Sequence, residues 1–454
     1  MATIHVATTG KDTNTGKQDA PVRNISRGMT LARAGDTVLV GDGTYTESLK
    51  PSMILMKAGV TLKAAHRRKA ILRTPSYCYA VVVMANNSTV DGFDIVGEHG
   101  HGIWADSSHH LKVTNNRMTG GYESGCGSMK SDFIRIEGNE TSCPHLSTWG
   151  SGITIYEPEM KALNAGEAEP EFRIIVRNNI SHGNFQEGGP FSDGNGIILD
   201  DFQHWQNDPK VEYNRGFLVE NNLCYDNGGK GIAIHWANNG IVRNNTCVRN
   251  NRDNKNGTTW RGELSQQGSH GVRWERNIGI PDKAVNVKNS GIGYYGDSST
   301  SIFSDNVVSD AKINLGGGPE PTSIGNRFNA DPKLVDFVPT APGFETVGWR
   351  PSGVVVPPVD PPVPPVDPDP TIAARLSAVE ALAASTAEQA AGMAAEYGQR
   401  LLMIEEKVAT LQAGQADLHA RLAVVEDAHD LSGVREELSR LDARLDAISG
   451  AARD

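Results

Sequence analysis

The sequence predicts an all-β domain built as a parallel β-helix, followed by a C-terminal α-helical coiled coil. The first observation is a short motif that recurs. Asn221-Asn222-Leu223-Cys224 returns 23 residues later as Asn244-Asn245-Thr246-Cys247. That interval fits neither a helical turn nor a hairpin, but it fits one coil of a solenoid. The second observation is a change, after a proline-rich stretch, to an alanine- and leucine-rich sequence with heptad spacing.

The motif extends in both directions as an apolar residue, one to three polar residues, Asn, and a second apolar run. A constant local pattern with variable gaps indicates loops of different length on a repeating frame. Asn adopts left-handed backbone geometry at bends, and stacked Asn side chains can bond each other along an axis. Strands would then lie about 4.8 Å apart. Phe93 stands 23 residues before the first of these positions, so the first coils are apolar there. The eight positions are Asn116, Asn139, Asn179, Asn222, Asn245, Asn277, Asn306 and Asn326.

Composition limits the partners. The 454 residues allow one large domain plus an extension. The chain has 43 Lys and Arg against 54 Asp and Glu, and this net charge of −11 argues against non-specific nucleic-acid binding. Five cysteines without CxxC spacing argue against zinc or a disulfide framework. Cys224 and Cys247 occupy equivalent places in successive coils, which predicts stacked buried thiols.

No apolar run is long enough to insert into a membrane, and the chain starts without a basic, apolar leader. We therefore expect synthesis in a cytoplasm and release by assembly or lysis.

Residues 1–50 predict a cap and the first strands. Residues 24–34 form a short amphipathic pattern, residues 37–40 read as a strand, and residues 41–45 as a turn. A helix here would cover the open end of the solenoid, whose strand edges otherwise invite aggregation.

The run from Gly35 to Glu47 resembles the opening of right-handed parallel β-helix proteins of the pectate-lyase-like superfamily, and the run from Asn329 to Val335 resembles their usual close. The resemblance covers about residues 1–350 and implies a right-handed β-helix over 51–350. It does not imply one substrate, because the superfamily includes lyases, hydrolases, epimerases and phage tailspikes.

The C-terminal part divides in two. Residues 351–371 are proline-rich, which favours a stiff polyproline II linker. Residues 372–454 predict a coiled coil for self-association, with a single amphipathic helix packed on the β-helix as the alternative. A homotrimer is expected only by resemblance to phage β-helix fibres. The heptad positions include Leu401, Ile404, Val408, Leu411, Leu418, Leu422, Val425, Leu431, Val434, Leu438, Leu441, Leu445 and Ile448.

A second motif locates a candidate face. Four segments begin Gly-Ile at positions 102, 152, 196 and 231, and their first and third residues after Gly point inward. If they stack in register, one outward column holds Asp106, Tyr156, Asp200 and His235. Glu157, Asp201 and Trp236 follow at the bend. Insertions at 158–171, 184–194 and 202–216 would wall a groove along this face.

The carboxylates suit two kinds of chemistry. Asp200 and Asp201, with Asp193 and Glu157 nearby, could act as acid and base on a glycosidic bond. As hard oxygen ligands, Asp193, Asp200 and Asp201 could instead hold Ca²⁺. Abstraction of a sugar proton would need a base, for which Lys230 and His235 are the candidates. The alternative is structural, because an Asp-Asp pair at a bend often only bonds backbone amides.

Aromatic residues suit sugar binding on the same face. Trp104, Trp205 and Trp236 are candidate platforms for sugar C–H groups, and His204 lies in the same loop region as Trp205. Together with Asp106 and Tyr156 they form the predicted substrate-binding set. Packing beneath the loops is the alternative for each of these rings.

The resemblance transfers no catalytic role. Polygalacturonase-type hydrolases carry Asn-x-Asp, Asp-Asp, Gly-His-Gly and Arg-x-Lys in that order. Here Asp200-Asp201 matches the second motif, but Gly100-His101-Gly102 precedes it, and no Arg-x-Lys follows.

These features predict a phage tail-associated protein, either a minor tail protein, a tail fibre or a tailspike. It would bind host cell-surface polysaccharide and cut it, would assemble with other tail proteins, and would reside in the virion. Two alternatives stay open. One is an extracellular bacterial polysaccharide lyase or glycoside hydrolase, and the other is a structural fibre or adhesin without catalysis.

Overall fold

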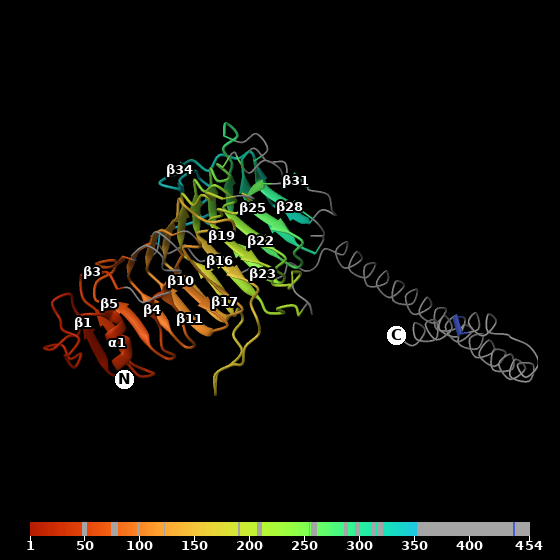
Figure 1. Ribbon diagram of the computed structural model, residues 1–454. Coiled ribbons are helices and arrows are strands. Elements are labelled where there is room, and N and C mark those ends of the chain that lie inside the picture. Colours follow the sequence, from red (N-terminus) through yellow and green to blue (C-terminus); the bar gives the residue numbers. More distant parts are fainter. Residues whose placement is uncertain are drawn as a thin grey trace, which may run out of the picture. The chain divides into compact units, whose positions relative to one another are not determined.

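The computed structural model describes most of the first 351 residues. The described ranges are 1–47, 52–73, 80–97, 100–121, 123–188, 191–206, 211–253, 255, 261–285, 289–295, 300–309, 314–315, 321–351 and 439–440. Residues 1–357 form one compact unit and 358–454 another. Within the first unit the strands follow one another in chain order, with the N-terminus in red at one end (Figure 1).

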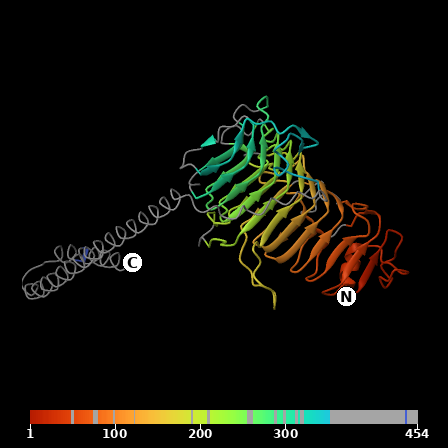
Figure 2. The same ribbon diagram turned by 180° about the vertical axis from the view of Figure 1, so that it is seen from behind.

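Three parallel sheets build the first unit, and each coil of chain contributes one strand to each sheet in turn. Counted over the described residues, the sheets have twelve, ten and eleven strands. Within these sheets each interior strand pairs with the equivalent strands of the coils before and after it, and β1 and β2 are the one pair of consecutive strands that are neighbours among the described residues. Seen from behind, the same succession of strands runs from red to teal (Figure 2). The chain is therefore a right-handed parallel β-helix, as predicted.

The twelve-stranded sheet contains β1 (Thr3–Val6), β2 (Thr37–Val40), β5 (Thr61–Ala64), β8 (Thr89–Asp91), β11 (His109–Thr114), β14 (Asp132–Glu137), β17 (Ile174–Arg177), β20 (Phe217–Glu220), β23 (Gly240–Arg243), β26 (Arg273–Glu275), β29 (Ile302–Ser304) and β32 (Thr322–Ile324). The ten-stranded sheet contains β4 (Ser52–Leu55), β7 (Ala80–Val83), β10 (His101–Asp106), β13 (Cys126–Met129), β16 (Ile153–Tyr156), β19 (Ile197–Asp200), β22 (Ile232–His235), β25 (Arg261–Gln267), β28 (Asn289–Tyr295) and β31 (Asn314–Leu315). The eleven-stranded sheet contains β3 (Gly43–Tyr45), β6 (Ala70–Arg73), β9 (Asp94–Gly97), β12 (Arg117–Gly120), β15 (Glu140–Ser142), β18 (Ile180–His182), β21 (Leu223–Tyr225), β24 (Thr246–Val248), β27 (Ile278–Ile280), β30 (Val307–Val308) and β33 (Arg327–Phe328).

The predicted Asn ladder is confirmed. Each Asn side chain donates from Nδ2 to Oδ1 of the next Asn, from Asn116 to Asn326, at 2.9–3.2 Å. Each Oδ1 also accepts a hydrogen bond from the backbone N–H of the preceding Asn in the ladder, and we call each such Asn a rung. Phe93 begins the series, since its N–H donates to Asn116 Oδ1 at 2.9 Å. The buried amides thus satisfy each other from coil to coil.

A second ladder lies at the bend that leads into the ten-stranded sheet, and the sequence analysis missed it. Asn184 donates to Asn227, and Asn227 to Asn250, each at 2.7 Å from Nδ2 to Oδ1. The buried Glu263 carboxylate ends the series by accepting from Asn250. Cys224 and Cys247 lie side by side in register as free, buried thiols, as predicted.

Inward side chains form a large continuous apolar core, and a smaller cluster contains Ile278, Val307 and Val347. The Gly-Ile frame is confirmed, because the two positions predicted to point inward are at most 1% exposed in all four strands. Helix α1 (Ile25–Leu31) falls within the expected span and contacts β1, β2 and β4. Its role as a cap stays a prediction.

The described chain ends by folding back along the eleven-stranded sheet. After the antiparallel pair β34 (Leu334–Val335) and β35 (Val338–Pro339), residues 344–350 run beside earlier coils. The Trp349 N–H donates to Thr246 Oγ1, and the Arg350 N–H to Asn221 Oδ1, each at 2.8 Å. The predicted linker and coiled coil lie outside the described residues, apart from Pro351 and the helical pair 439–440. In the part of the chain that the structure describes, no helix has the length and apolar character needed to cross a membrane.

Candidate functional site on the ten-stranded sheet

The predicted outward column exists on the ten-stranded sheet, with one addition. Tyr156, Asp200 and His235 are Cα partners in three successive strands. Asp106 belongs to the same column, but β13 lies between it and Tyr156 and contributes Met129. The prediction placed these two coils directly together and is corrected here. The sequence did carry a signal, because β13 follows Gly125 with Cys where the other strands have Ile.

Asp200 and His235 form the centre of the column. Their Oδ1 and Nδ1 atoms lie 2.7 Å apart, and both side chains are about one-fifth exposed. The His235 ring stacks on Trp236, with ring centroids 4.0 Å apart. His235 Nε2 is buried and has no hydrogen-bond partner among the described residues. Asp200 Oδ1 is likewise buried and makes no hydrogen bond of normal geometry, so the two side chains are in close contact at Nδ1, and Nε2 lies beneath the surface.

Asp201 and Glu157 sit at the predicted bend but face into the protein. Both have positive φ, and they are 0% and 4% exposed. The Asp201 carboxylate accepts the backbone N–H groups of Trp205 at 2.6 Å and Gln206 at 3.0 Å. Burial raises the pKa of Asp201, and these two N–H donors oppose that shift. The contacts of Asp201 are those of a carboxylate that holds a turn, which was the alternative reading of the Asp-Asp pair.

Asp193 and Lys230 lie at the other edge of the same strands. Burial raises the pKa of Asp193 to about 6, while the positive charge of Lys230 opposes the shift. Asn195 Nδ2 and Ser192 Oγ donate to the Asp193 carboxylate at 2.9 and 3.0 Å. Lys230 Nζ donates to the Ser192 carbonyl at 2.8 Å. The edge therefore holds a carboxyl group whose pKa favours proton exchange near neutral pH.

The predicted calcium site is not assembled. Within the described residues, no group of three or more His, Cys, Asp and Glu side chains is placed to hold a metal ion. The reason is geometric, because consecutive strand residues point to opposite sides. Asp200 faces outward, and Asp201 turns into the bend, where backbone N–H groups occupy its carboxylate.

Of the remaining substrate-binding candidates, some side chains are exposed to solvent and others contact the protein. Trp205 is 52% exposed. Tyr156 donates to Gln206 Oε1 at 3.4 Å, and burial together with Glu157 raises the Tyr156 pKa. His204 is 7% exposed, and its Nε2 contacts the Pro158 carbonyl at 3.0 Å.

Trp104 stacks on His101, with centroids 3.8 Å apart, three strands from Asp200, while Asp106 is exposed. His204 and Trp104 thus pack against the protein, whereas Trp205 is open to solvent.

Two features of this face escaped the sequence analysis. Gln267 and Tyr295 extend the column beyond His235, and Tyr295 is 45% exposed. The signal was present, since Gly291-Ile292 repeats the Gly-Ile frame. The insertion at 158–171 reaches the neighbouring twelve-stranded sheet. Its Asn164 contacts Asn87, which precedes β8, and its Glu167 contacts His110 of β11.

The three parallel sheets and the Asn ladder give the chain the fold of a right-handed parallel β-helix. A family described as a protein of unknown function, DUF1565, matches residues 8–75. No curated protein sequence matches the chain.

Solved structures with a similar fold include a double mutant of a periplasmic alginate epimerase, which is 13% identical in sequence. The match covers 65% of this chain and 70% of the epimerase chain, with a TM-score of 0.40. The A-module of an Azotobacter vinelandii mannuronan C-5 epimerase is 10% identical, covering 65% and 87%, with a TM-score of 0.38. Pectate lyase Pel9A is 14% identical, covering 73% and 79%, with a TM-score of 0.38.

Proposed function

We propose that this protein binds and cleaves polysaccharide along the outer face of the ten-stranded sheet, as a tail-associated protein of a phage that attacks host cell-surface glycan. The observation that carries the proposal is the Asp200–His235 pair, 2.7 Å apart, with a buried His235 Nε2 that has no partner among the described residues. The exposed Trp205 and the ring of Trp236 beside His235 supply apolar surfaces of the kind that sugar rings contact.

The chemistry follows from the positions of the side chains. Asp200 holds the His235 imidazole at Nδ1 and stabilises its charge when Nε2 takes a proton from the glycan or from a water molecule. Asp193, with a pKa of about 6, is the group suited to give a proton to the leaving sugar oxygen. In this proposal His235 is the base and Asp193 is the acid. They lie at opposite ends of the strands of the ten-stranded sheet, and the glycan binds between them.

The proposed place in a virion is supported by sequence features and not by the fold. A β-helix followed by a proline-rich linker and a predicted coiled coil suits a fibre-like protein that assembles through its C-terminal part. Genomic neighbours test this part. Tail-assembly genes on both sides would support it, whereas sugar-uptake genes would favour a bacterial lyase or hydrolase.

The activity is tested with purified full-length protein and a panel of bacterial surface polysaccharides. New reducing ends without ultraviolet absorbance indicate hydrolysis, and both together indicate elimination. His235→Gln should slow cleavage by about 100-fold or more, because the base is lost. His66→Gln is the matched control, since His66 also pairs with an aspartate at 3.0 Å but on the eleven-stranded side. If Asp200→Asn combined with His235→Gln leaves cleavage and binding unchanged, the site is misplaced. Binding without any cleavage would leave only the adhesin function.

A further inference from the structure

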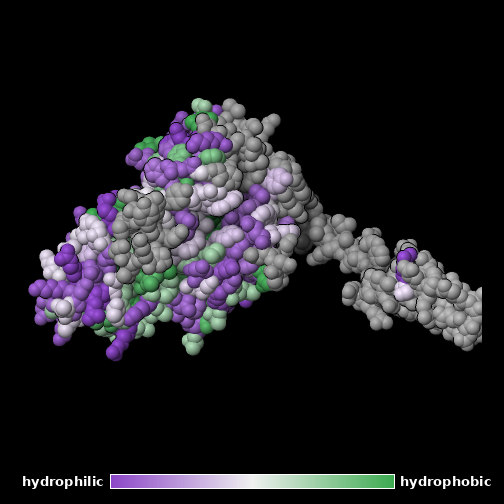
Figure 3. Space-filling view, viewed as in Figure 1, coloured by the Kyte–Doolittle hydropathy of each residue, from purple (hydrophilic) through white to green (hydrophobic). Residues whose placement is uncertain are grey.

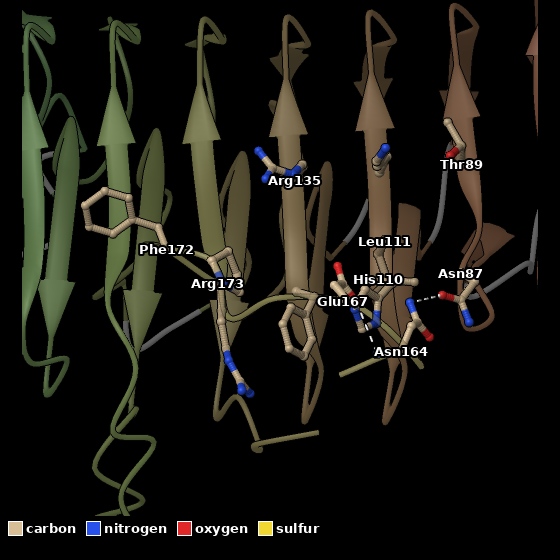
Figure 4. A pocket seen from close by; sticks show the side chains of 12 residues that line it. Asn87, Thr89, His110, Leu111, Arg135, Asn164, Glu167, Phe172 and Arg173 are labelled. Atoms are coloured by element: carbon tan, nitrogen blue, oxygen red, sulfur yellow. Dashed lines mark hydrogen bonds and ion pairs between the residues drawn. The ribbon is translucent and has the colours of Figure 1, made fainter. Parts of the chain in front are cut away.

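A cavity, which we call the loop pocket, lies on the twelve-stranded sheet. It has a volume of about 390 Å³ and lies between β8, β11, β14 and the segment 164–173. Figure 4 shows Thr89 and Arg135 on the strands, with Asn164 and Glu167 reaching towards Asn87 and His110. No residue of the loop pocket belongs to the candidate face. A site here therefore stands or fails separately from the proposed function.

The floor of the loop pocket concentrates positive charge. Thr89, Lys112 and Arg135 are Cα partners in three successive strands, so their side chains project from one column about 4.8 Å apart. Two like charges directly paired across strands repel each other. Hydrophilic residues cover much of the face drawn in Figure 3, and the chain as a whole has a net charge of −11. Lys112 and Arg135 therefore form a local pair of cations on an acidic protein.

Neither cation of the floor is fully compensated. Lys112 is exposed, and its ammonium group makes no ion pair or hydrogen bond with the described residues. Arg135 Nη1 lies 3.6 Å from Glu137 Oε1, and the same oxygen lies 3.2 Å from Arg177 Nε. One carboxylate is thus shared between two guanidinium groups, and the floor keeps excess positive charge that an anionic ligand would neutralise.

The wall of the loop pocket is held in place without a ligand. Glu167 Oε2 lies 2.7 Å from His110 Nε2, and Asn164 Nδ2 donates to Asn87 Oδ1 at 2.9 Å. Arg173 binds the fully buried Asp132 at 2.7 Å and anchors the loop from below.

Strained backbone lies beneath the same wall. His110 and Phe133 have φ values of 57° and 52°, a backbone region that bulky residues rarely adopt, and their rings stack 4.1 Å apart. Such strain persists where the surrounding structure fixes it, and it gathers at ligand sites.

We propose that the loop pocket binds a saccharide unit that carries a carboxylate. Lys112 and Arg135 would pair with the carboxylate, Arg135 through its planar fork. The partly exposed Phe172 ring, at the edge of the pocket, offers its face to sugar C–H groups. Glu167, the carboxylate in the wall, is suited to accept hydrogen bonds from sugar hydroxyl groups.

Calorimetric titration of the full-length protein tests this site. The probes are tetragalacturonic acid, a hyaluronan tetrasaccharide and tetramannuronic acid, with methyl-esterified tetragalacturonic acid as the uncharged counterpart. At least one acidic probe should bind, and loss of charge in the ester or in Lys112→Gln combined with Arg135→Gln should weaken binding by about tenfold or more. Arg243→Gln, which removes a cation from the same sheet elsewhere, should leave binding unchanged.

Three results would overturn the site. One is that no acidic probe binds, and another is that the double variant binds as tightly as the parent. The third is displacement by an equal concentration of acetate, which would mean that an isolated carboxylate is recognised and not a sugar unit. Loss of binding in Arg243→Gln to the same extent would show only non-specific attraction and would also reject the proposal.

Discussion

Asn222 shows how one side chain supports the solenoid. It is fully buried, donates from Nδ2 to Asn245 Oδ1 and to the Val176 carbonyl, and accepts from the backbone and the side chain of Asn179. These four hydrogen bonds give partners to two polar groups of Asn222 and to four polar groups of its neighbours, all of them buried. A buried polar group that loses its partner costs more than an average hydrogen bond contributes.

The first prediction follows from these contacts. Asn222→Ala should lower the free energy of unfolding by about 2–5 kcal/mol, because it leaves the Asn179 N–H and the Val176 carbonyl without partners. The measurement is urea-induced unfolding. Asn326→Ala is the matched control, since Asn326 ends the ladder and is partly exposed, and it should cost less than half as much. Equal losses for the two variants would mean that the ladder is not the source of stability.

Glu263 gives a prediction for pH. Burial raises its pKa from 4.5 to about 8, although Asn250 and Asn289 donate to its carboxylate and oppose the shift. The folded protein therefore holds a proton that the unfolded chain releases above about pH 4.5. This contribution to stability is complete below that pH and is lost as the pH rises through about 8.

The test compares unfolding free energies of the parent and Glu263→Gln between pH 5 and pH 8.5. The parent should lose stability over this interval relative to the variant, because glutamine has no proton to release. The difference between the two curves isolates residue 263 from other titrating groups. Parallel curves would show that the carboxyl group is not protonated in the folded state.

The segment 158–173 shows at the level of elements how a loop is fixed by a few buried groups. Asp132 is fully buried and accepts from Arg173 Nη1, the Lys161 N–H and the Tyr213 hydroxyl at 2.5–2.8 Å. Arg173 also binds Glu169 at 2.7 Å, and its guanidinium lies over the Phe133 ring. The Phe133 N–H is a fourth donor, at 2.8 Å. Burial of Asp132 is tolerated because four donors surround it and one of them, Arg173, carries a positive charge.

Breaking this group should release the loop. Asp132→Ala should cost about 3–5 kcal/mol, because it leaves Arg173 buried without its partner. Glu169→Ala, which removes the exposed partner of the same arginine, should cost at most about 1 kcal/mol. Thermal unfolding and limited proteolysis within 158–173 measure the two effects. Faster cleavage in Glu169→Ala than in Asp132→Ala would contradict the assignment of Asp132 as the anchor.

The sequence predicted the features of the fold that repeat from coil to coil and missed those that occur once. The Asn ladder and the Gly-Ile frame recur at fixed local spacing, so the coils, the inward positions and the Asp200–His235 contact followed from pattern alone. The coil of β13 was missed because Cys126 replaces the usual Ile.

The destinations of the loops could not be predicted. The course of 158–173 depends on Arg173 meeting Asp132, 41 residues away, and no periodicity encodes that contact. The sequence predicted Asp200 outward and Asp201 at the bend, but only the structure shows that backbone N–H groups occupy the Asp201 carboxylate.

At the scale of the whole molecule, assembly is assigned to the C-terminal part. We expect the full-length protein to self-associate, because residues 372–454 carry the heptad pattern, and the resemblance to phage β-helix fibres makes a homotrimer the expected species in sedimentation. A chain that ends after Pro357, the last residue of the first compact unit, should sediment as a monomer. Analytical ultracentrifugation of both chains is the measurement. A monomeric full-length protein, or an equally associated truncated one, would remove the role of the predicted coiled coil.

The ladder also makes the length of the β-helix an adjustable quantity. Every interior rung offers the same acceptor to the coil before it and the same donor to the coil after it, so Asn179 meets Asn222 as Asn222 meets Asn245. Removal or duplication of the residues from one such Asn to the next, an interval of 23 between Asn222 and Asn245, would rejoin identical chemical groups. Descendants of one ancestral gene can thus differ in reach by whole coils while keeping the same ends.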